Sequence, residues 1–103
     1  MKTHPKKQMT VICEVPVMRR IERILDKVPV SGYTVFPALA GRGSEGDWDR
    51  DNWIGDANRM VMIVSVMSVD QAEIAIDRIY EAIEPQMGIV TVADVEVLRP
   101  ERF

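Results

Sequence analysis

The chain has 103 residues, 47% of them hydrophobic, and a formal net charge of −3, which predicts one domain with a modest core. Nucleic acids select basic surfaces, so the negative charge argues against a nucleic-acid partner. No apolar run is long enough to cross a bilayer and no signal-peptide pattern opens the chain, so we expect a cytoplasmic protein without membrane insertion.

The first third of the chain predicts a strand followed by a helix. Residues 1–7 are basic and are expected to form a flexible tail. Residues 9–15 are rich in β-branched side chains and predict a strand. Pro16 is well placed to open a helix at its first turn, and Pro29 and Gly32 end that helix. Its apolar face is predicted from Val17, Ile21, Ile24, Leu25 and Val28.

Two strand-like runs flank a long polar segment in the middle of the chain. Residues 33–39 predict a strand, and Pro37 within it favours an edge position. Residues 60–67 are almost continuously apolar, as expected when both faces of a strand are covered. Between them, residues 40–58 are rich in glycine and charge. Connections of this length are usually functional or disordered, so we interpret the segment as a flexible binding arm.

The last third predicts a second helix and a final strand. Asp70 and Glu73 have the spacing of a capping box, and Pro85 ends the helix. Gly88 then opens a strand over residues 89–98. The buried stripe of the helix is predicted from Ala72, Ile76, Ile79, Tyr80 and Ile83.

This order of elements predicts one α+β domain over residues 1–103. Two βαβ units make the ferredoxin-like split βαβ sandwich, with four antiparallel strands and both helices on one face. The strand at residues 60–67 is apolar on its second face too, so something must cover that face. We expect sister subunits to do so.

The glycine-rich start of the long segment is the strongest candidate for a binding site. Glycines free the backbone N–H groups to face an anion, and the guanidinium of Arg42 can grip a phosphate with two parallel donors. An ordinary turn is the alternative reading. Gly88 could likewise allow a ligand near the backbone, or could be only a helix-to-strand turn. Arg99 and Arg102 could close over a ligand or stay solvated.

Catalysis and metal binding have little support in the sequence. Cys13 is expected to be a buried, inert thiol that fits a reducing compartment, and His4 lies in the tail, so we predict no enzyme. Asp47, Asp49 and Asp51 alternate like calcium ligands, but the glycine and glutamate that a calcium loop needs are missing. We therefore predict no metal. Trp48 and Trp53 either contact a partner or pack back onto the protein.

Five short motifs together resemble the PII signalling family over about residues 8–99. They are Gly32-Tyr33-Thr34-Val35, Ala40-Gly41-Arg42-Gly43-Ser44, the apolar strand at 60–67, Gly88-Ile89-Val90 and Val95-Glu96-Val97-Leu98. The sequence is most similar to the PII-like branch linked to inorganic carbon, with carboxysome-associated and bicarbonate-transporter-associated members. The resemblance implies a homotrimer that binds adenine nucleotides in clefts between subunits. Residues 40–58 correspond to the family's T-loop, which reports the ligand state to a partner.

The resemblance also implies a set of site residues. The nucleotide-binding set is Gly32, Tyr33, Thr34, Val35, Gly41, Arg42, Gly43, Ser44, Asn58, Met60, Val61, Gly88, Ile89, Val90 and Arg99. Bicarbonate is a candidate second ligand, with Arg42 or Arg59 as donors. The partner would be a bicarbonate transporter or a carboxysome component, contacted through Trp48 and Trp53.

Departures from the family pattern narrow the expected ligand. The T-loop has no tyrosine, so modification of a tyrosine is not expected. The segment at residues 84–88 lacks the family's lysine, and Glu45 and Asp47 would repel a third phosphate, so we expect ADP or AMP rather than ATP. The alternatives are a metal-binding trimer like the CutA proteins, which share the architecture, or a small enzyme.

Overall fold

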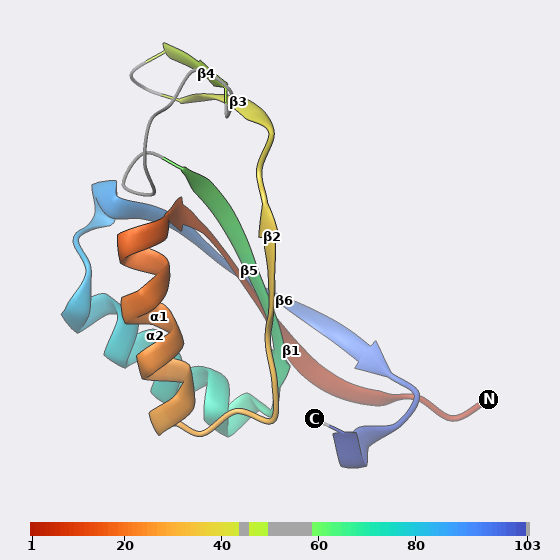
Figure 1. The fold of residues 1–103 in the computed structure, drawn as a ribbon. Helices are drawn as coiled ribbons and strands as arrows, with labels where there is room; N and C mark the ends of the chain where they lie inside the picture. Colours follow the sequence, from red (N-terminus) through yellow and green to blue (C-terminus); the bar gives the residue numbers. More distant parts are fainter. Residues whose placement is uncertain (44–45, 50–58, 103) are drawn as a thin grey trace.

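A four-stranded antiparallel sheet carries two helices on one of its faces (Figure 1). The computed structural model describes residues 1–43, 46–49 and 59–102. The strand order is β2-β5-β1-β6, with a separate two-stranded sheet formed by β3 and β4. This confirms the predicted ferredoxin-like fold. The elements are β1 (His4–Glu14), α1 (Val15–Lys27), β2 (Thr34–Pro37), β3 (Ala40–Gly43), β4 (Gly46–Asp49), β5 (Met60–Met67), α2 (Val69–Ala82), the 3-10 turn η3 (Pro85–Met87), β6 (Gly88–Val97) and the 3-10 turn η4 (Pro100–Arg102).

Strand β1 begins within the predicted flexible tail, so that prediction is wrong for residues 4–7. His4 pairs with Val97, and Lys7 pairs with Asp94 of β6. The ammonium of Lys7 also donates to the Asp94 carboxylate. Backbone pairing and opposite charges across the two strands therefore hold a segment whose composition alone suggested fraying.

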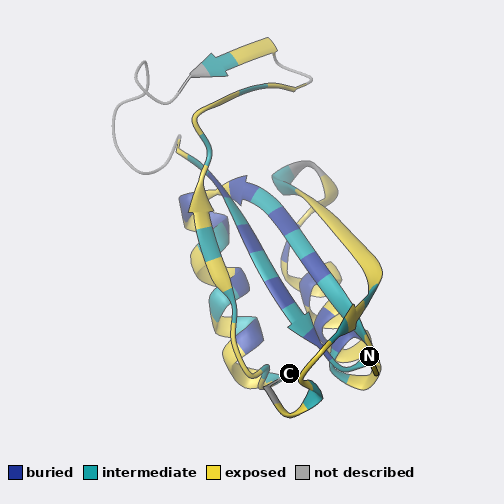
Figure 2. Cartoon of the chain, turned by 90° about the vertical axis from the view of Figure 1, so that its right-hand side faces the viewer, coloured by how far each residue is buried: buried dark blue, intermediate teal, exposed yellow. Residues whose placement is uncertain are grey.

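The core lies between the helices and one face of the sheet. Side chains alternate between half-buried and buried along β5 and over residues 8–13 of β1, as Figure 2 shows for the two central strands. Helix α1 contributes an apolar face much as predicted, and its first turn holds Pro16. The buried core consists of Met9, Val11, Cys13, Val15, Val17, Ile21, Leu25, Val61, Ile63, Met67, Ala72, Ala75, Ile79 and Ile83.

Helix α2 is capped slightly earlier in the chain than Asp70 and Glu73 predict. The hydroxyl of Ser68 accepts from the backbone N–H of Gln71 at 3.1 Å, and the side-chain oxygen of Gln71 accepts from the N–H of Ser68 at 3.1 Å. This reciprocal pair is a capping box. The helix begins at Val69, so Ser68 rather than Asp70 occupies the N-cap position.

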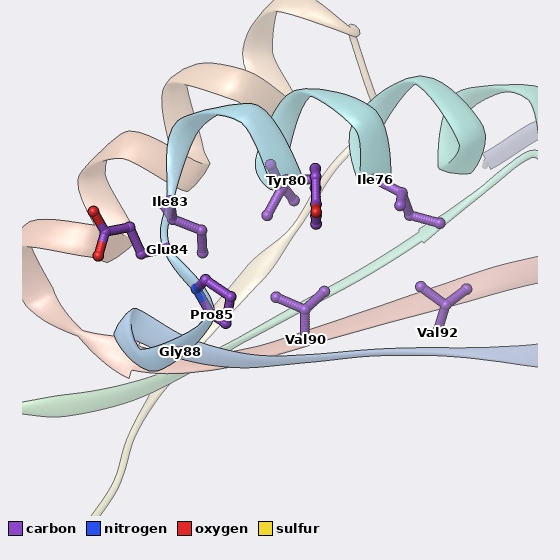
Figure 3. Close-up of a pocket in the computed structure, with 9 residues that line it drawn as sticks. Ile76, Tyr80, Ile83, Glu84, Pro85, Gly88, Val90 and Val92 are labelled. Carbon is purple, nitrogen blue, oxygen red and sulfur yellow. The ribbon is translucent and has the colours of Figure 1, made fainter.

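The buried stripe of α2 is also displaced from the prediction. Ala72, Ala75 and Ile79 are buried, whereas Ile76 is 39% exposed and Tyr80 is 81% exposed. Ala75 takes a buried position on the helix, while the larger Ile76 and Tyr80 lie on the side of α2 that faces the edge strand β6. Both side chains point toward β6 in Figure 3.

The second face of the sheet carries no helix and is largely apolar. A row of four side chains crosses all four strands, because Phe36 pairs with Met62, Met62 with Ile12, and Ile12 with Ile89. The two central members of the row are half-buried, and the two outer ones are exposed. Strand β2 lies at an edge, as Pro37 predicts. None of the helices in the described ranges is long and apolar enough to cross a membrane.

Candidate functional site

The first part of the T-loop forms a short hairpin that projects from the sheet (Figure 1). Arg42 of β3 lies opposite Asp47 of β4, and Gly41 lies opposite Trp48. Gly46 has a φ of 104°, a conformation that suits glycine. The remainder of the T-loop, including the proposed contact residue Trp53, lies outside the described residues.

Arg42 and Asp47 form a two-pronged ion pair. Nε of Arg42 donates to Oδ1 of Asp47 at 2.5 Å, and Nη2 donates to Oδ2 at 3.4 Å. Both side chains are exposed, at 80% and 71%. The donors that would grip a phosphate therefore already hold a carboxylate from the facing strand. The sequence suggested Asp47 as a calcium-like ligand or as a charge that repels a third phosphate, and did not indicate this contact.

Trp48 packs onto its own hairpin. A Cβ atom built on Gly41 would lie 2.3 Å from Cζ2 of the indole, so the ring occupies the space above the glycine backbone. Trp48 is accordingly only half-exposed. Of the two readings left open for Trp48, this geometry favours packing back onto the protein. A side chain at position 41 would have to displace the indole from this place.

The predicted residues 32–35 lie along the β2 edge of the sheet. Thr34 pairs with Val64 of β5, and the buried hydroxyl of Ser65 donates to the carbonyl of Gly32 at 2.7 Å. That hydrogen bond fixes the backbone just before β2. Desolvation, and then the neighbouring carboxylates of helix α1, raise the pKa of the Tyr33 phenol above its ordinary value. Tyr33 is therefore a neutral hydrogen-bonding group at physiological pH.

The start of β6 lies very close to β1. A Cβ atom on Gly88 would lie 3.1 Å from the carbonyl oxygen of Ile12 and 3.2 Å from Cβ of Cys13. Burial, and secondarily Glu14, raises the pKa of the Cys13 thiol to about 11. Cys13 is therefore protonated at neutral pH, which agrees with the expected inert thiol.

An apolar cavity of about 380 Å³ lies between α2 and β6 (Figure 3). Ile76 and Tyr80 line it from the helix, and Val90 and Val92 line it from the strand, with Gly88 at one end. Sequence reasoning missed the cavity because it assigned Ile76 and Tyr80 to the core. Two residues of the predicted nucleotide set, Gly88 and Val90, thus border a hollow that no sequence motif indicated.

One chain does not bring the predicted nucleotide-binding residues together. Residues 32–35 lie at the β2 edge of the four-stranded sheet, and residues 41–43 lie on the separate β3–β4 hairpin. Residues 88–90 begin β6 at the opposite edge of the four-stranded sheet. Strands β5, which carries residues 60–61, and β1 lie between the two edges. Arg99 follows β6 at the far end from Gly88. Ser44 and Asn58, also predicted, lie outside the described residues.

The remaining candidates occupy separate places. Arg59, proposed for bicarbonate, is exposed just before β5, and its carbonyl accepts from the N–H of Val15 at 3.0 Å. In the described part of the chain, no three His, Cys, Asp or Glu side chains gather as a metal site would require. Asp51 of the calcium-like series lies outside that part, and Asp47 faces Arg42.

Comparison with known proteins places the chain in a family. Residues 6–102 match the family model for nitrogen regulatory protein P-II. The chain therefore belongs to the P-II family, and the resemblance found in the sequence is confirmed. No curated protein is significantly similar to the chain in sequence.

Three solved structures show the same fold. One is CPII, a nitrogen regulatory PII-like protein from Thiomonas intermedia K12, bound to ADP, AMP and bicarbonate. Its sequence is 27% identical to this chain, and the TM-score is 0.83. The match covers 99% of this chain and 96% of that chain. CPII bound to ADP and bicarbonate is 28% identical, with a TM-score of 0.83 over 99% and 97%. A PII-like signalling protein from Thermus thermophilus is 25% identical, with a TM-score of 0.79 over 100% and 99%.

Proposed function

We propose that this chain is a cytoplasmic PII-like sensor that binds ADP or AMP in preference to ATP, in clefts between the subunits of a homotrimer. Its role is binding and signalling rather than catalysis. Support comes from its membership of the P-II family and from the similarity to CPII, whose structures hold ADP, AMP and bicarbonate.

The observation that carries the proposal is the strand order. Residues 32–35 and residues 88–90 lie at opposite edges of one sheet, with two strands between them. A nucleotide can touch both groups only if the β2 edge of one chain meets the β6 edge of another. The predicted residues could therefore bind one nucleotide together between two subunits, but not within a single chain.

The bare face of the sheet supports assembly as well. The row formed by Phe36, Met62, Ile12 and Ile89 crosses the sheet without a covering helix. Exposed apolar patches of this kind mark protein–protein contacts. Three copies that turn these faces toward a common axis would bury the rows and bring unlike sheet edges together.

The preference for a short phosphate chain follows from the charges at the site. Arg42 is the one basic side chain on the described hairpin strands, and Asp47 sits beside it. Residues 84–88 contain no lysine. A third phosphate would add negative charge without adding a cation to bind it.

Bicarbonate and a protein partner complete the proposal. Arg42 and Arg59 are the candidate donors to bicarbonate, on the basis of the bicarbonate seen with CPII. The T-loop would carry the signal to a bicarbonate transporter or a carboxysome component, because bound ligands commonly switch such segments between ordered and disordered states.

Calorimetric titration with AMP, ADP and ATP, each with and without bicarbonate, tests the proposal. We expect ADP or AMP to bind more tightly than ATP, and bicarbonate to strengthen binding. Absence of binding by all three nucleotides would contradict the proposal and would make metal binding, as in CutA-like trimers, the next function to test.

Replacement of Arg42 by alanine tests the phosphate contact in particular. We expect Arg42→Ala to weaken ADP binding by about 1–3 kcal/mol, the cost of losing one charged hydrogen-bonding partner. Arg78→Ala, which removes an exposed arginine from α2, is the matched control and should leave the affinity unchanged. Equal affinity for the two variants would exclude Arg42 from the site.

A further inference from the structure

We propose that Asp47 is a built-in competitor of the nucleotide: it holds Arg42 in the ligand-free chain, and a bound phosphate takes its place and loosens the β3–β4 hairpin. This inference rests on the proposed function, because it assigns Arg42 to the nucleotide phosphate. It adds a regulatory role for Asp47, a residue outside the predicted nucleotide-binding set.

The contact geometry makes the carboxylate and the phosphate alternatives. Asp47 accepts from Nε and Nη2 of Arg42 with its two carboxylate oxygens. Carboxylates and phosphates are both recognised by this planar pair of donors. A phosphate that takes these donors leaves Asp47 without its arginine and adds negative charge next to it. Bound phosphate and an intact Arg42–Asp47 pair therefore oppose each other.

The hairpin is a small element. Among the described residues, β3 and β4 form a sheet of two strands that is separate from the main sheet. Isolated two-stranded hairpins are marginally stable in water. The Arg42–Asp47 pair and the packing of the Trp48 indole on Gly41 both join β3 to β4. Loss of the ion pair should therefore shift the hairpin toward an open state.

Trp48 reports whether the hairpin is closed. It lies in the register position next to Asp47 and depends on the strand pairing for its place over Gly41. When β4 separates from β3, the indole leaves the glycine and becomes more exposed to water. Its fluorescence emission then shifts to longer wavelength. Nucleotide binding is thereby linked to the surface that the hairpin presents to a partner.

The experiment uses the full chain with Trp53→Phe, so that Trp48 is the only tryptophan. Asp47→Asn removes the charge of the competitor and nearly keeps its shape. Glu73→Gln, an equal charge change on the exposed side of α2, is the matched control. ADP affinity is measured by calorimetry, and Trp48 emission is recorded with and without ADP.

We expect Asp47→Asn to bind ADP about three- to fivefold more tightly than the parent, the scale of one exposed ion pair. Its emission without ADP should already resemble that of the ADP-bound parent. Glu73→Gln should match the parent in both readouts. Unchanged or weaker ADP binding by Asp47→Asn would overturn the inference, as would ADP binding by the parent without a change in Trp48 emission.

The results distinguish failure of the Asp47 competitor from failure of nucleotide binding itself. If the parent, Asp47→Asn and Glu73→Gln all bind ADP with equal affinity, the competitor is refuted and nucleotide sensing stands. If none of the three binds ADP, both proposals are refuted. If Asp47→Asn alone binds ADP measurably, the competitor is supported in its strongest form.

Discussion

The indole of Trp48 occupies the space that a side chain at position 41 would need. A Cβ on Gly41 would lie 2.3 Å from the ring, whereas a Cβ on Gly43 would meet nothing within 4 Å. The two glycines of the same short strand thus have different reasons to be glycine. The first makes room for a neighbour, and the second is free of that constraint.

We expect Gly41→Ala to displace the Trp48 ring and shift its emission to longer wavelength in a chain carrying Trp53→Phe. Gly43→Ala is the control within the same strand and should leave the emission close to that of the parent. Because the hairpin lies apart from the core, urea unfolding should show little change for either variant. Identical emission from both variants would contradict the packing of Trp48 on Gly41.

The buried thiol of Cys13 links stability to alkaline pH. Its pKa is raised to about 11 in the folded chain, from an ordinary value of 9.0. Between these values the unfolded chain loses the thiol proton first, so the free energy of unfolding should fall as the pH rises from 9 to 11. The measurement is urea unfolding across this range. Cys13→Ala should fall less steeply, and equal slopes would contradict the prediction.

At the scale of elements, the N-cap of α2 lies two residues before the position that the sequence predicts. Asp70 and Glu73 have the right spacing for a capping box, but the hydrogen bonds belong to Ser68 and Gln71. Both pairs fit the same pattern. Only the position at which the chain leaves β5 decides which pair caps the helix.

We expect Ser68→Ala to lower the free energy of unfolding by about 1 kcal/mol through loss of the N-cap hydrogen bond. Asp70→Asn should cost less, because Asp70 contributes only a charge in the first turn. Urea unfolding of the two variants measures the difference. A larger loss for Asp70→Asn would place the cap where the spacing first suggested.

The order and type of the main elements could be predicted because apolar periodicity is strong in the helices and because β5 is an almost continuous apolar run. The start of β1 could not be predicted, because residues 4–7 are held by pairing with β6, which is distant in sequence. The exposure of Ile76 and Tyr80 could not be predicted either, because several positions of α2 are apolar and periodicity alone does not decide which of them face the core.

The family could be predicted from the sequence, whereas the contacts around the candidate site could not. Gly41 and Arg42 belong to one of several motifs that together predicted the P-II family, and that family is confirmed. The contact between Arg42 and Asp47 depends on the register of a hairpin, and the cavity beside Tyr80 depends on the rotation of α2. A local sequence motif predicts neither the register of the hairpin nor the rotation of the helix.

At the scale of the molecule, the bare sheet face makes assembly the central test. We expect Met62→Lys to disrupt the trimer, because it places a charge at the centre of the apolar row. The measurement is sedimentation equilibrium, with a change from about three times the 11.7 kDa chain mass toward a single chain. Glu73→Lys on the exposed side of α2 should leave the mass unchanged. A trimer that survives Met62→Lys would exclude this face as the interface.

Candidate ligand residues lie at opposite edges of one sheet, so the apparent nucleotide affinity should depend on the protein concentration. A ligand held by two chains at once obeys mass action in the protein as well as in the ligand. Dilution would lower the apparent affinity for nucleotide, and saturating nucleotide would protect the assembly from dissociation. The cellular abundance of the protein would then set the nucleotide level at which it responds.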